Sequence, residues 1–284
     1  MTRTEWTRGV AELAGRHDAF LIDQWGVLHN GKEPYPGVPD CLENLKRAGK
    51  RVVVLSNSPR RVDYNRASLV RKGIGEGLFS DVITSGEVAW QMLADGRLGL
   101  GRKCLLVSSN DDRSRVEGTG VAVVENIPEA DFLFISSYNG ELDNLAPVLA
   151  AAAKAKLPAL CSNPDFTLVN PDGAMLDGPG AMARRYEEMG GHVTYIGKPH
   201  PQVYECALEI LGMDKGKILA VGDSFYHDIG GAARMGIASL FITGGIHAPE
   251  FPDGMGGEEK QAALEALVQK YGFAPDFAMP SFIW

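Results

Sequence analysis

The chain has 284 residues, of which 45% are hydrophobic and 23% charged, values typical of a globular protein with one large domain or two modest ones. Its formal net charge of −8 argues against nucleic-acid binding, which requires a basic face, and its apolar runs fall short of the ~20 residues that span a bilayer. The amino-terminal segment lacks the apolar core of a signal peptide and the four cysteines have no paired spacing, so we expect a cytoplasmic protein with reduced thiols and no membrane partner.

Short apolar runs recur along the chain, and each ends in small or polar residues. They are continuous rather than alternating, which is typical of strands buried on both faces of a parallel sheet. The predicted strands lie within residues 19–23, 51–58, 81–86, 104–110, 121–126, 132–137, 158–165, 192–199, 217–224 and 239–245. We expect the runs between 104 and 165 to form a smaller sheet of their own.

Helical segments separate these runs, for example at 37–50, 144–156 and 202–213. Left-handed glycines are expected near the ends of such segments, at Gly49, Gly190 and Gly212. Alternation of strands and helices predicts a doubly wound α/β architecture.

The carboxyl-terminal residues 277–284 are apolar. We expect them to complete an edge of the main sheet and to bury Phe282 and Trp284.

The residues that close the runs are candidates for function, because ligands bind beyond the carboxyl ends of the strands in an open parallel sheet. Asp23 closes the first run, and Ser56, Asn57 and Ser58 close the second. A strand-terminal Asp is commonly a turn former, and serines commonly cap a helix, here one beginning near Pro59. The functional alternative is a carboxylate nucleophile beside a hydroxyl and backbone N–H groups that bind phosphate oxygens.

Two later run ends carry charge. Lys198, in GKPHP, is either a solvated turn residue or a fixed positive charge that neutralises phosphate. Asp223 and Asp228 lie five residues apart after Gly222. Two carboxylates at one sheet edge suit a single divalent ion, and this hard oxygen environment favours Mg²⁺. Together with Asp23, these residues predict a site for phosphate chemistry.

Four motifs, DxxGVLxxG, VVLSNS, GKPxP and VGDSxxxDIxGAxxxG, occur in this order. They resemble the signature motifs of the haloacid dehalogenase superfamily, and the resemblance covers residues 18–248. The long insertion before the third motif, with SNPDF at 162–166 near its end, resembles the class IIA branch of sugar-phosphate, nitrophenyl-phosphate and pyridoxal-phosphate phosphatases. The resemblance implies a Rossmann-like α/β core over 1–86 and 190–284, with a smaller inserted C2-type α/β cap over 87–189.

The resemblance also implies an activity: a Mg²⁺-dependent hydrolase, specifically a phosphatase of a small phosphorylated metabolite. Asp23 would attack phosphorus to form an aspartyl-phosphate, Ser56 would hold the phosphoryl group and Lys198 would stabilise its charge. The implied metal ligands are Asp23, the backbone carbonyl of Trp25, Asp223 and Asp228. The implied phosphate- and substrate-binding residues are Ser56, Asn57, Ser58, Arg60 and Lys198.

Trp25 departs from the family's phosphatase pattern, which is Asp-x-Asp. The missing Asp protonates the leaving oxygen and later activates water, help that contributes ~10² to 10⁴ in rate. Indole donates one hydrogen bond but does not relay a proton. We therefore expect impaired or relocated acid–base help and a preference for leaving groups that need no protonation. His29, His200 and His227 are candidate substitutes, although a loop histidine is commonly just solvated.

Two other functions stay open. An aromatic residue at position 25 resembles the haloacid dehalogenases proper, in which Asp attacks carbon and expels halide, but the intact GDSFYHD loop and the type of cap count against this reading. A phosphometabolite-binding or regulatory protein needs only Ser56, Lys198 and the ion, whereas the retained Asp23 favours chemistry. Metal-dependent release of phosphate that Asp23→Asn abolishes would separate an enzyme from a binding protein.

Specificity is less constrained. Arg60 and Arg61 resemble the basic pair of pyridoxal-phosphate-type members, and they are either contacts for an anionic substrate or a solvated helical turn. The glycine-rich segment 170–182 is either part of a lid or a plain connection. Class IIA relatives often pair through their caps, so a homodimer is the default expectation.

Overall fold

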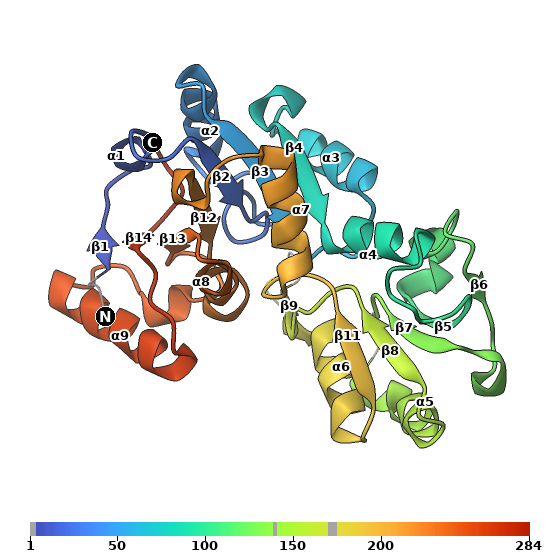
Figure 1. Cartoon of the computed structure of the whole chain (residues 1–284). Helices are drawn as coiled ribbons and strands as arrows, with labels where there is room; N and C mark the ends of the chain where they lie inside the picture. Colours follow the sequence, from blue (N-terminus) through green and yellow to red (C-terminus); the bar gives the residue numbers. More distant parts are fainter. Residues whose placement is uncertain (1–3, 139–140, 170–174) are drawn as a thin grey trace. The chain divides into compact units, whose positions relative to one another are not determined.

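Two parallel sheets contain most of the apolar runs of the sequence (Figure 1). The computed structural model describes residues 4–138, 141–169 and 175–284. The chain divides into two compact units. The core unit comprises Met1–Ser56, Arg66–Ile83 and Tyr204–Trp284, and the inserted unit comprises Asn57–Asn65 and Thr84–Val203.

The core unit is built around a seven-stranded sheet with the strand order β1-β14-β13-β12-β2-β3-β4. Its strands are β1 (Glu5–Trp6), β2 (Ala19–Ile22), β3 (Arg51–Ser56), β4 (Asp81–Thr84), β12 (Ile218–Gly222), β13 (Ala238–Ile242) and β14 (Phe277–Met279). Every residue of the central strands β2 and β12 is buried, and the two strands pair in parallel. Strands covered on both faces need apolar side chains at every position, which explains their continuous runs.

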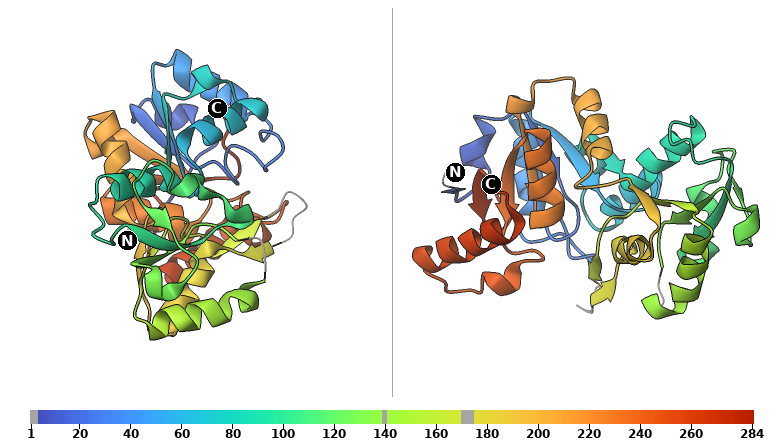
Figure 2. Two further views of the ribbon diagram at one scale, coloured as in Figure 1. Left: turned by 90° about the vertical axis from the view of Figure 1, so that its right-hand side faces the viewer. Right: turned by 60° about the horizontal axis from the view of Figure 1, so that its bottom comes forward.

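Helices lie on both faces of this sheet (Figure 2). They are α1 (Ala11–Ala14), α2 (Val38–Arg47), α3 (Val62–Arg71), α7 (Pro201–Leu211), α8 (Gly230–Met235) and α9 (Gly257–Tyr271). The strand order runs in opposite directions from the β2–β12 pair, so right-handed connections put α2 on one face and α8 and α9 on the other. Leu264 and Leu267 of α9 share a buried cluster with Phe241 of β13 and Ala278 of β14.

The inserted unit has its own five-stranded sheet with the order β11-β8-β7-β5-β6. Its strands are β5 (Lys103–Val107), β6 (Ala122–Val123), β7 (Phe132–Ile135), β8 (Pro158–Cys161) and β11 (His192–Tyr195), and β9 (Thr167–Val169) pairs antiparallel with β10 (Met175–Asp177). The helices are α4 (Ser85–Ala94), α5 (Leu142–Lys154) and α6 (Pro179–Glu188). Leu149 of α5 and Met182 of α6 pack with Ile135 of β7 in one buried cluster.

The predicted α/β architecture is confirmed, since each predicted run contains a strand and Gly49, Gly190 and Gly212 have φ of 70°, 88° and 57°. The smaller sheet extends beyond residue 165, however, because β11 pairs with β8. The ranges given for core and cap stay a prediction. Of the segment 170–182, residues 170–174 lie outside the described residues, and 179–182 begin α6.

Two local predictions are wrong. The helix expected near Pro59 begins at Val62, because residues 59–61 turn before α3 starts. Strand β14 is not the edge of its sheet, because β1 pairs with its outer side. Phe282 is buried as expected, but Trp284 is 40% exposed.

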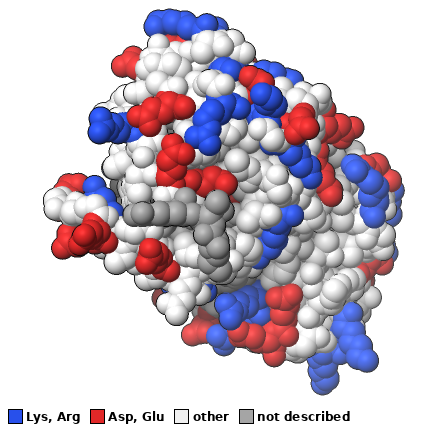
Figure 3. Space-filling view, turned by 60° about the vertical axis from the view of Figure 1, so that its left-hand side comes forward, with Lys and Arg blue, Asp and Glu red and all other residues white. Residues whose placement is uncertain are grey.

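No helix in the described part of the chain is long and apolar enough to cross a membrane. On the face drawn in Figure 3, lysine and arginine side chains are interspersed with aspartate and glutamate side chains. That face therefore does not present the continuous basic surface that nucleic-acid binding requires.

Candidate active site

Three carboxylates of the core unit meet at the carboxyl ends of β2 and β12. Asp23 directly follows β2, and its N–H donates to the carbonyl oxygen of Val221 in β12 at 2.9 Å. Asp223 directly follows β12, and Asp228 lies on the π-helical turn Phe225–Ile229. One carboxylate oxygen of each acid lies within 4.8 Å of those of the other two. The structure therefore brings together the acids that the sequence singled out.

Backbone N–H groups hold two of these carboxylates. The N–H of Ile246 donates to Asp223 Oδ2 at 2.7 Å, and the N–H of Ser224 donates to Asp228 Oδ2 at 3.0 Å. Asp223 and Asp228 are only 5% and 4% exposed. Like charges this close repel each other in a poorly hydrated site. A hard divalent cation would relieve that repulsion, and an all-oxygen donor set suits Mg²⁺ or Ca²⁺.

Glycines make room for the carboxylates. A Cβ atom at Gly245 would lie 2.1 Å from Asp223 Oδ2, and one at Gly26, where φ is 83°, would lie 1.9 Å from the same oxygen. These distances are far inside van der Waals contact, so any side chain at either position displaces the carboxylate.

We expect Gly245→Ala to raise the dissociation constant for Mg²⁺ by about 10-fold or more, because disturbing the support of a metal ligand typically costs 10- to 100-fold in affinity. Calorimetric titration of the variant with Mg²⁺ measures this constant. Gly257→Ala is the matched control, because a Cβ there meets nothing within 4 Å. Equal affinities in the two variants would show that Asp223 does not hold the ion.

Ser56 is the last residue of β3, which pairs in parallel with β2. Its side chain therefore lies at the same sheet edge as Asp23, one strand away. The residue is 8% exposed. This is the arrangement expected of a hydroxyl that works beside a strand-terminal carboxylate.

Trp25 is fixed by contacts within its own loop. Its indole packs edge-on against the imidazole of His29, with ring centroids 5.7 Å apart and an interplanar angle of 83°. A Cβ at Gly31 would lie 2.2 Å from Trp25 Cη2, so the indole also lies against that backbone. The side chain is nevertheless 37% exposed. A partly exposed indole that contacts its own loop thus occupies the place of the acid in the family pattern.

His29 is buried at 3% exposure, so reading it as a solvated loop residue is wrong. The N–H of Gly31 donates to His29 Nδ1 at 3.1 Å, which places the ring proton of the neutral form on Nε2. Burial, helped by the charge of Lys72, lowers the pKa of His29 to about 4. An imidazole with this pKa is neutral at pH 7 and has no acidic proton to give. His29 is suited to positioning Trp25, and it is unsuited to replacing the missing acid.

Lys198 of the inserted unit is 4% exposed, and Asn57 holds its main chain. The N–H of Lys198 donates to Asn57 Oδ1 at 2.7 Å, and Asn57 Nδ2 donates to the Lys198 carbonyl oxygen at 3.0 Å. Asn57 Nδ2 also donates to Asp165 Oδ1 at 2.8 Å. The amide of Asn57 therefore positions Lys198, and any phosphate contact from Asn57 would use its backbone N–H. Asp165 lies in the SNPDF motif, which had suggested the family but no role for this residue.

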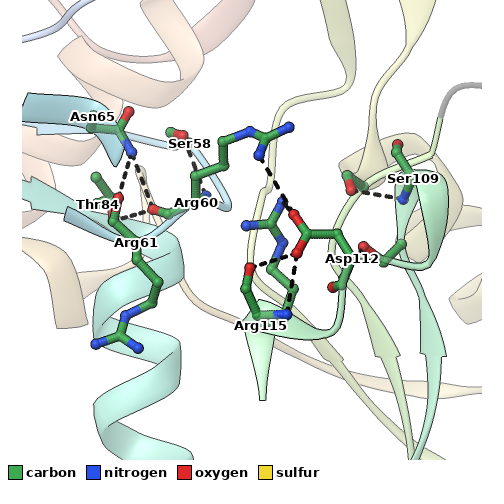
Figure 4. A network of polar contacts seen from close by, with 11 residues as sticks. Ser58, Arg60, Arg61, Asn65, Thr84, Ser109, Asp112 and Arg115 are labelled. Atoms are coloured by element: carbon green, nitrogen blue, oxygen red, sulfur yellow. Dashed lines mark hydrogen bonds and ion pairs between the residues drawn. The ribbon is translucent and has the colours of Figure 1, made fainter. Parts of the chain in front are cut away.

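Arg61 is paired within the inserted unit, and its side chain is 31% exposed. Its Nε and Nη2 donate to Glu87 Oε2 and Oε1 at 2.6 and 3.0 Å, and its guanidinium carbon lies 3.8 Å from the Trp90 ring centroid. The neighbouring Arg60 points instead toward Asp112, while Ser58 Oγ accepts from the Arg60 N–H at 3.3 Å (Figure 4).

His200 and His227, the other two histidines considered as substitutes for the missing acid, each have a partner within their own unit. His200 stacks on Tyr195 with ring centroids 5.1 Å apart and an angle of 3°. His227 directly precedes Asp228, and its Nδ1 lies 3.1 Å from Ser224 Oγ. Their roles as acid–base substitutes stay predictions.

Comparison with known proteins places this chain in a family. Residues 90–236 match the family described as haloacid dehalogenase-like hydrolase, and residues 20–122 match a second family of that description. Chronophin from Bos taurus is 29% identical over 274 residues, which cover 88% of this chain and 90% of that protein.

Two solved structures are similar to this chain over most of its length. A haloacid dehalogenase-like hydrolase from Brucella suis 1330 has a TM-score of 0.83 and 27% identity, and the match covers 98% of this chain and all of that one. A glycerol phosphate phosphatase from Mycobacterium tuberculosis, in complex with magnesium, has a TM-score of 0.67 and 29% identity over 82% of this chain and 70% of that one.

Proposed function

This chain belongs to the haloacid dehalogenase-like hydrolases, and we propose from that premise that it is a Mg²⁺-dependent phosphatase with Asp23 as nucleophile. Its substrate would be a small phosphorylated metabolite. The observation that carries the proposal is the cluster of Asp23, Asp223 and Asp228, whose carboxylate oxygens lie within 4.8 Å of one another. The similar phosphatase from Mycobacterium tuberculosis, with its glycerol phosphate substrate and bound magnesium, supports this choice.

The reaction has two displacements at phosphorus. In the first, an oxygen of the Asp23 carboxylate bonds to phosphorus as the bond to the leaving oxygen breaks, which gives an aspartyl-phosphate and an alkoxide or phenolate that then takes a proton from water. In the second, water attacks phosphorus, the bond to Asp23 breaks, and phosphate and a proton leave. A divalent ion held by the three acids supplies charge neutralisation between the anionic nucleophile and the anionic substrate.

Trp25 cannot carry a proton in either displacement, because indole neither releases nor accepts one at neutral pH. The leaving oxygen departs without a proton from this position, so substrates whose alcohol is acidic react fastest. The attacking water likewise loses its proton without a carboxylate at position 25. His29 does not compensate, because it is neutral and its Nδ1 already accepts a hydrogen bond. The enzyme is therefore proposed to favour aryl and acyl phosphates.

We assign Ser56 to holding the phosphoryl group and Lys198 to neutralising it. The position of Ser56 at the end of β3 supports the first role. The buried setting of Lys198 and its fixed main chain support the second, because a fixed charge needs no reorganisation during the reaction. Backbone N–H groups of Asn57 and Ser58 are the further proposed phosphate donors. The homodimer stays a prediction.

Metal-dependent turnover of nitrophenyl phosphate tests the proposal. We expect nitrophenol release with Mg²⁺, loss of release in excess chelator, and recovery when Mg²⁺ is added back. Release that persists at the same rate in chelator would contradict the role of the three acids. Tight binding of nitrophenyl phosphate without any release would favour the binding-protein alternative, and halide release from a haloacid would favour carbon–halide hydrolysis.

A further inference from the structure

A cavity of about 640 Å³ lies within the core unit, and none of the site residues described above lines it. This volume falls within the range of ~300 to 1,000 Å³ that small-molecule sites occupy. Its lining residues include Trp6, Arg8, Lys260, Gln261, Pro280 and Ile283. The cavity is therefore a second candidate site in the unit that holds Asp23.

Three elements of the core unit form the walls of this cavity. Trp6 ends β1, which pairs with β14, and Pro280 follows β14. Lys260 lies in the first turn of α9, and Trp6 Nε1 donates to Gln261 Oε1 of this helix at 3.2 Å. Strand β1 lies three strands from β12, and adjacent strands are ~4.8 Å apart. The cavity thus lies at the carboxyl edge of the sheet, ~14 Å from the strand that precedes Asp223.

The charged residues that line the cavity within the described part of the chain are both basic. They are Arg8, which is exposed, and Lys260, which is half-buried, and neither forms an ion pair with another described residue. Of the two acids in the first turn of α9, Glu258 does not line the cavity. The other, Glu259, accepts a hydrogen bond from the N–H of Gly256 at 2.7 Å through its Oε2. Two unpaired positive charges in one concave site attract an anion.

Part of the remaining wall is apolar. Trp6 contributes an indole, and Pro280 and Ile283 contribute aliphatic carbon. Covering this surface with an apolar body is favourable, whereas a bare inorganic ion would leave it in contact with water. The guanidinium of Arg8 suits a carboxylate, because its planar N–H groups match the two carboxylate oxygens. The chemistry of the walls therefore favours an organic anion.

We propose that this cavity binds a small aromatic carboxylate, and that the bound carboxylate strengthens Mg²⁺ binding at the three acids. Arg8 and Lys260 hold the charge of the ligand, and Trp6 packs against its ring. The carboxylate site stands without any statement about the reaction. The coupling rests on the function proposed above, because it requires Asp223 to hold the ion.

A short stretch of backbone connects the cavity to Asp223. The N–H of Gly244 donates to the carbonyl oxygen of Pro280, a lining residue, at 2.9 Å. Two residues later, the N–H of Ile246 donates to Asp223 Oδ2 at 2.7 Å. The glycines at 244 and 245 give this stretch conformational freedom that ordering removes. A ligand packed on Pro280 restrains the stretch, so less freedom is lost when the ion binds.

Two probes with one ring system isolate the charge of the ligand. 1-Naphthoate carries a carboxylate where 1-naphthylmethanol carries a hydroxymethyl group. In calorimetric titrations of the metal-free protein, we expect the wild type to bind 1-naphthoate about 10-fold or more tightly than the alcohol. Arg8→Gln and Lys260→Gln should each raise the Kd of 1-naphthoate by about 10-fold, because each removes a charge-assisted hydrogen bond. Neither variant should change the Kd of the alcohol.

Lys270→Gln is the matched control, and it should leave the Kd of 1-naphthoate unchanged. Lys270 lies in the last turn of the same helix and does not line the cavity. Melting temperatures identify a variant that fails to fold, and either of the Arg8 and Lys260 variants decides the test without the other. An affinity for 1-naphthoate that equals that for the alcohol, or that the folded variants keep, would overturn the carboxylate site. Dimers that Arg8→Gln dissociates, in a protein that binds no 1-naphthoate, would overturn it in favour of a second copy of this chain.

Titration with Mg²⁺ in the presence and absence of saturating 1-naphthoate tests the coupling. We expect 1-naphthoate to lower the Kd of Mg²⁺ by about 5-fold, and saturating Mg²⁺ to lower the Kd of 1-naphthoate by the same factor, because coupling between two sites is reciprocal. The variant that combines Arg8→Gln with Lys260→Gln should show no such change. An unchanged Kd of Mg²⁺ in protein saturated with 1-naphthoate would overturn the coupling. Wild type that binds 1-naphthoate but no Mg²⁺ would support the carboxylate site and contradict both the coupling and the proposed metal site.

Discussion

Replacing Asp23 with asparagine is expected to lower kcat for nitrophenyl phosphate by about 10⁴-fold or more, because an amide does not attack phosphorus as a carboxylate does. The two side chains have nearly the same shape, so the melting temperature should change little. Steady-state nitrophenol release at saturating Mg²⁺ measures the loss, and the high metal concentration limits any contribution from weaker metal binding.

The control for this variant is Asp18→Asn. Asp18 lies just before β2, at the opposite end of the strand from Asp23. Its exposed carboxylate forms an ion pair with Lys50, with 3.0 Å between Lys50 Nζ and Asp18 Oδ1. An exposed ion pair contributes little to stability, so this variant should retain wild-type activity. If Asp23→Asn kept a tenth or so of the wild-type rate, a different group would have to be the nucleophile.

Replacing Trp25 with aspartate is expected to raise kcat for glycerol 3-phosphate by about 10²- to 10⁴-fold, the range that general acid–base help contributes. The new carboxyl group would protonate the alkyl leaving oxygen and then activate water. Formation of the aspartyl-phosphate from nitrophenyl phosphate should gain much less, because nitrophenolate leaves without a proton. Comparing single-turnover and steady-state rates for the two substrates measures both effects.

Trp25→Phe is the paired variant. Phenylalanine keeps an aromatic ring for the contact with His29 but carries no ionisable group. It should therefore give no gain with glycerol 3-phosphate. A gain as large as that of the aspartate variant would attribute the effect to space or flexibility. Wild-type enzyme that hydrolyses glycerol 3-phosphate as fast as nitrophenyl phosphate would show that another residue already moves the proton.

The strands that were predictable from the sequence are those in which every residue is buried. The runs at β2 and β12 are apolar throughout because both faces are covered, and this pattern is readable without the structure. Strand β1 has two residues and β9 has three, which is too short for a pattern to stand out. The place of β11 in the smaller sheet depends on pairing with β8, a long-range choice that its own residues do not specify.

The acids of the site were predictable for a related reason, since parallel strands deliver their final residues to one sheet edge. The supporting contacts were not. Asn57 holds Lys198 across 141 residues, and Arg60 meets Asp112 across 52. No local pattern encodes these pairs, because each is created by folding. The low pKa of His29 is a further example. It results mainly from burial, which the sequence of a loop does not indicate.

Stopped-flow measurement of nitrophenol release, with substrate in excess over enzyme and Mg²⁺ present, tests the role of Asp23 most directly. We predict a burst of about one equivalent per chain followed by a slow phase, because Asp23 is phosphorylated quickly and Trp25 does not activate the water that frees it. The burst should be absent in Asp23→Asn. A burst of the same size in Asp23→Asn, or wild-type release that is linear from the first turnover with no phosphate trapped on Asp23, would contradict the proposed nucleophile.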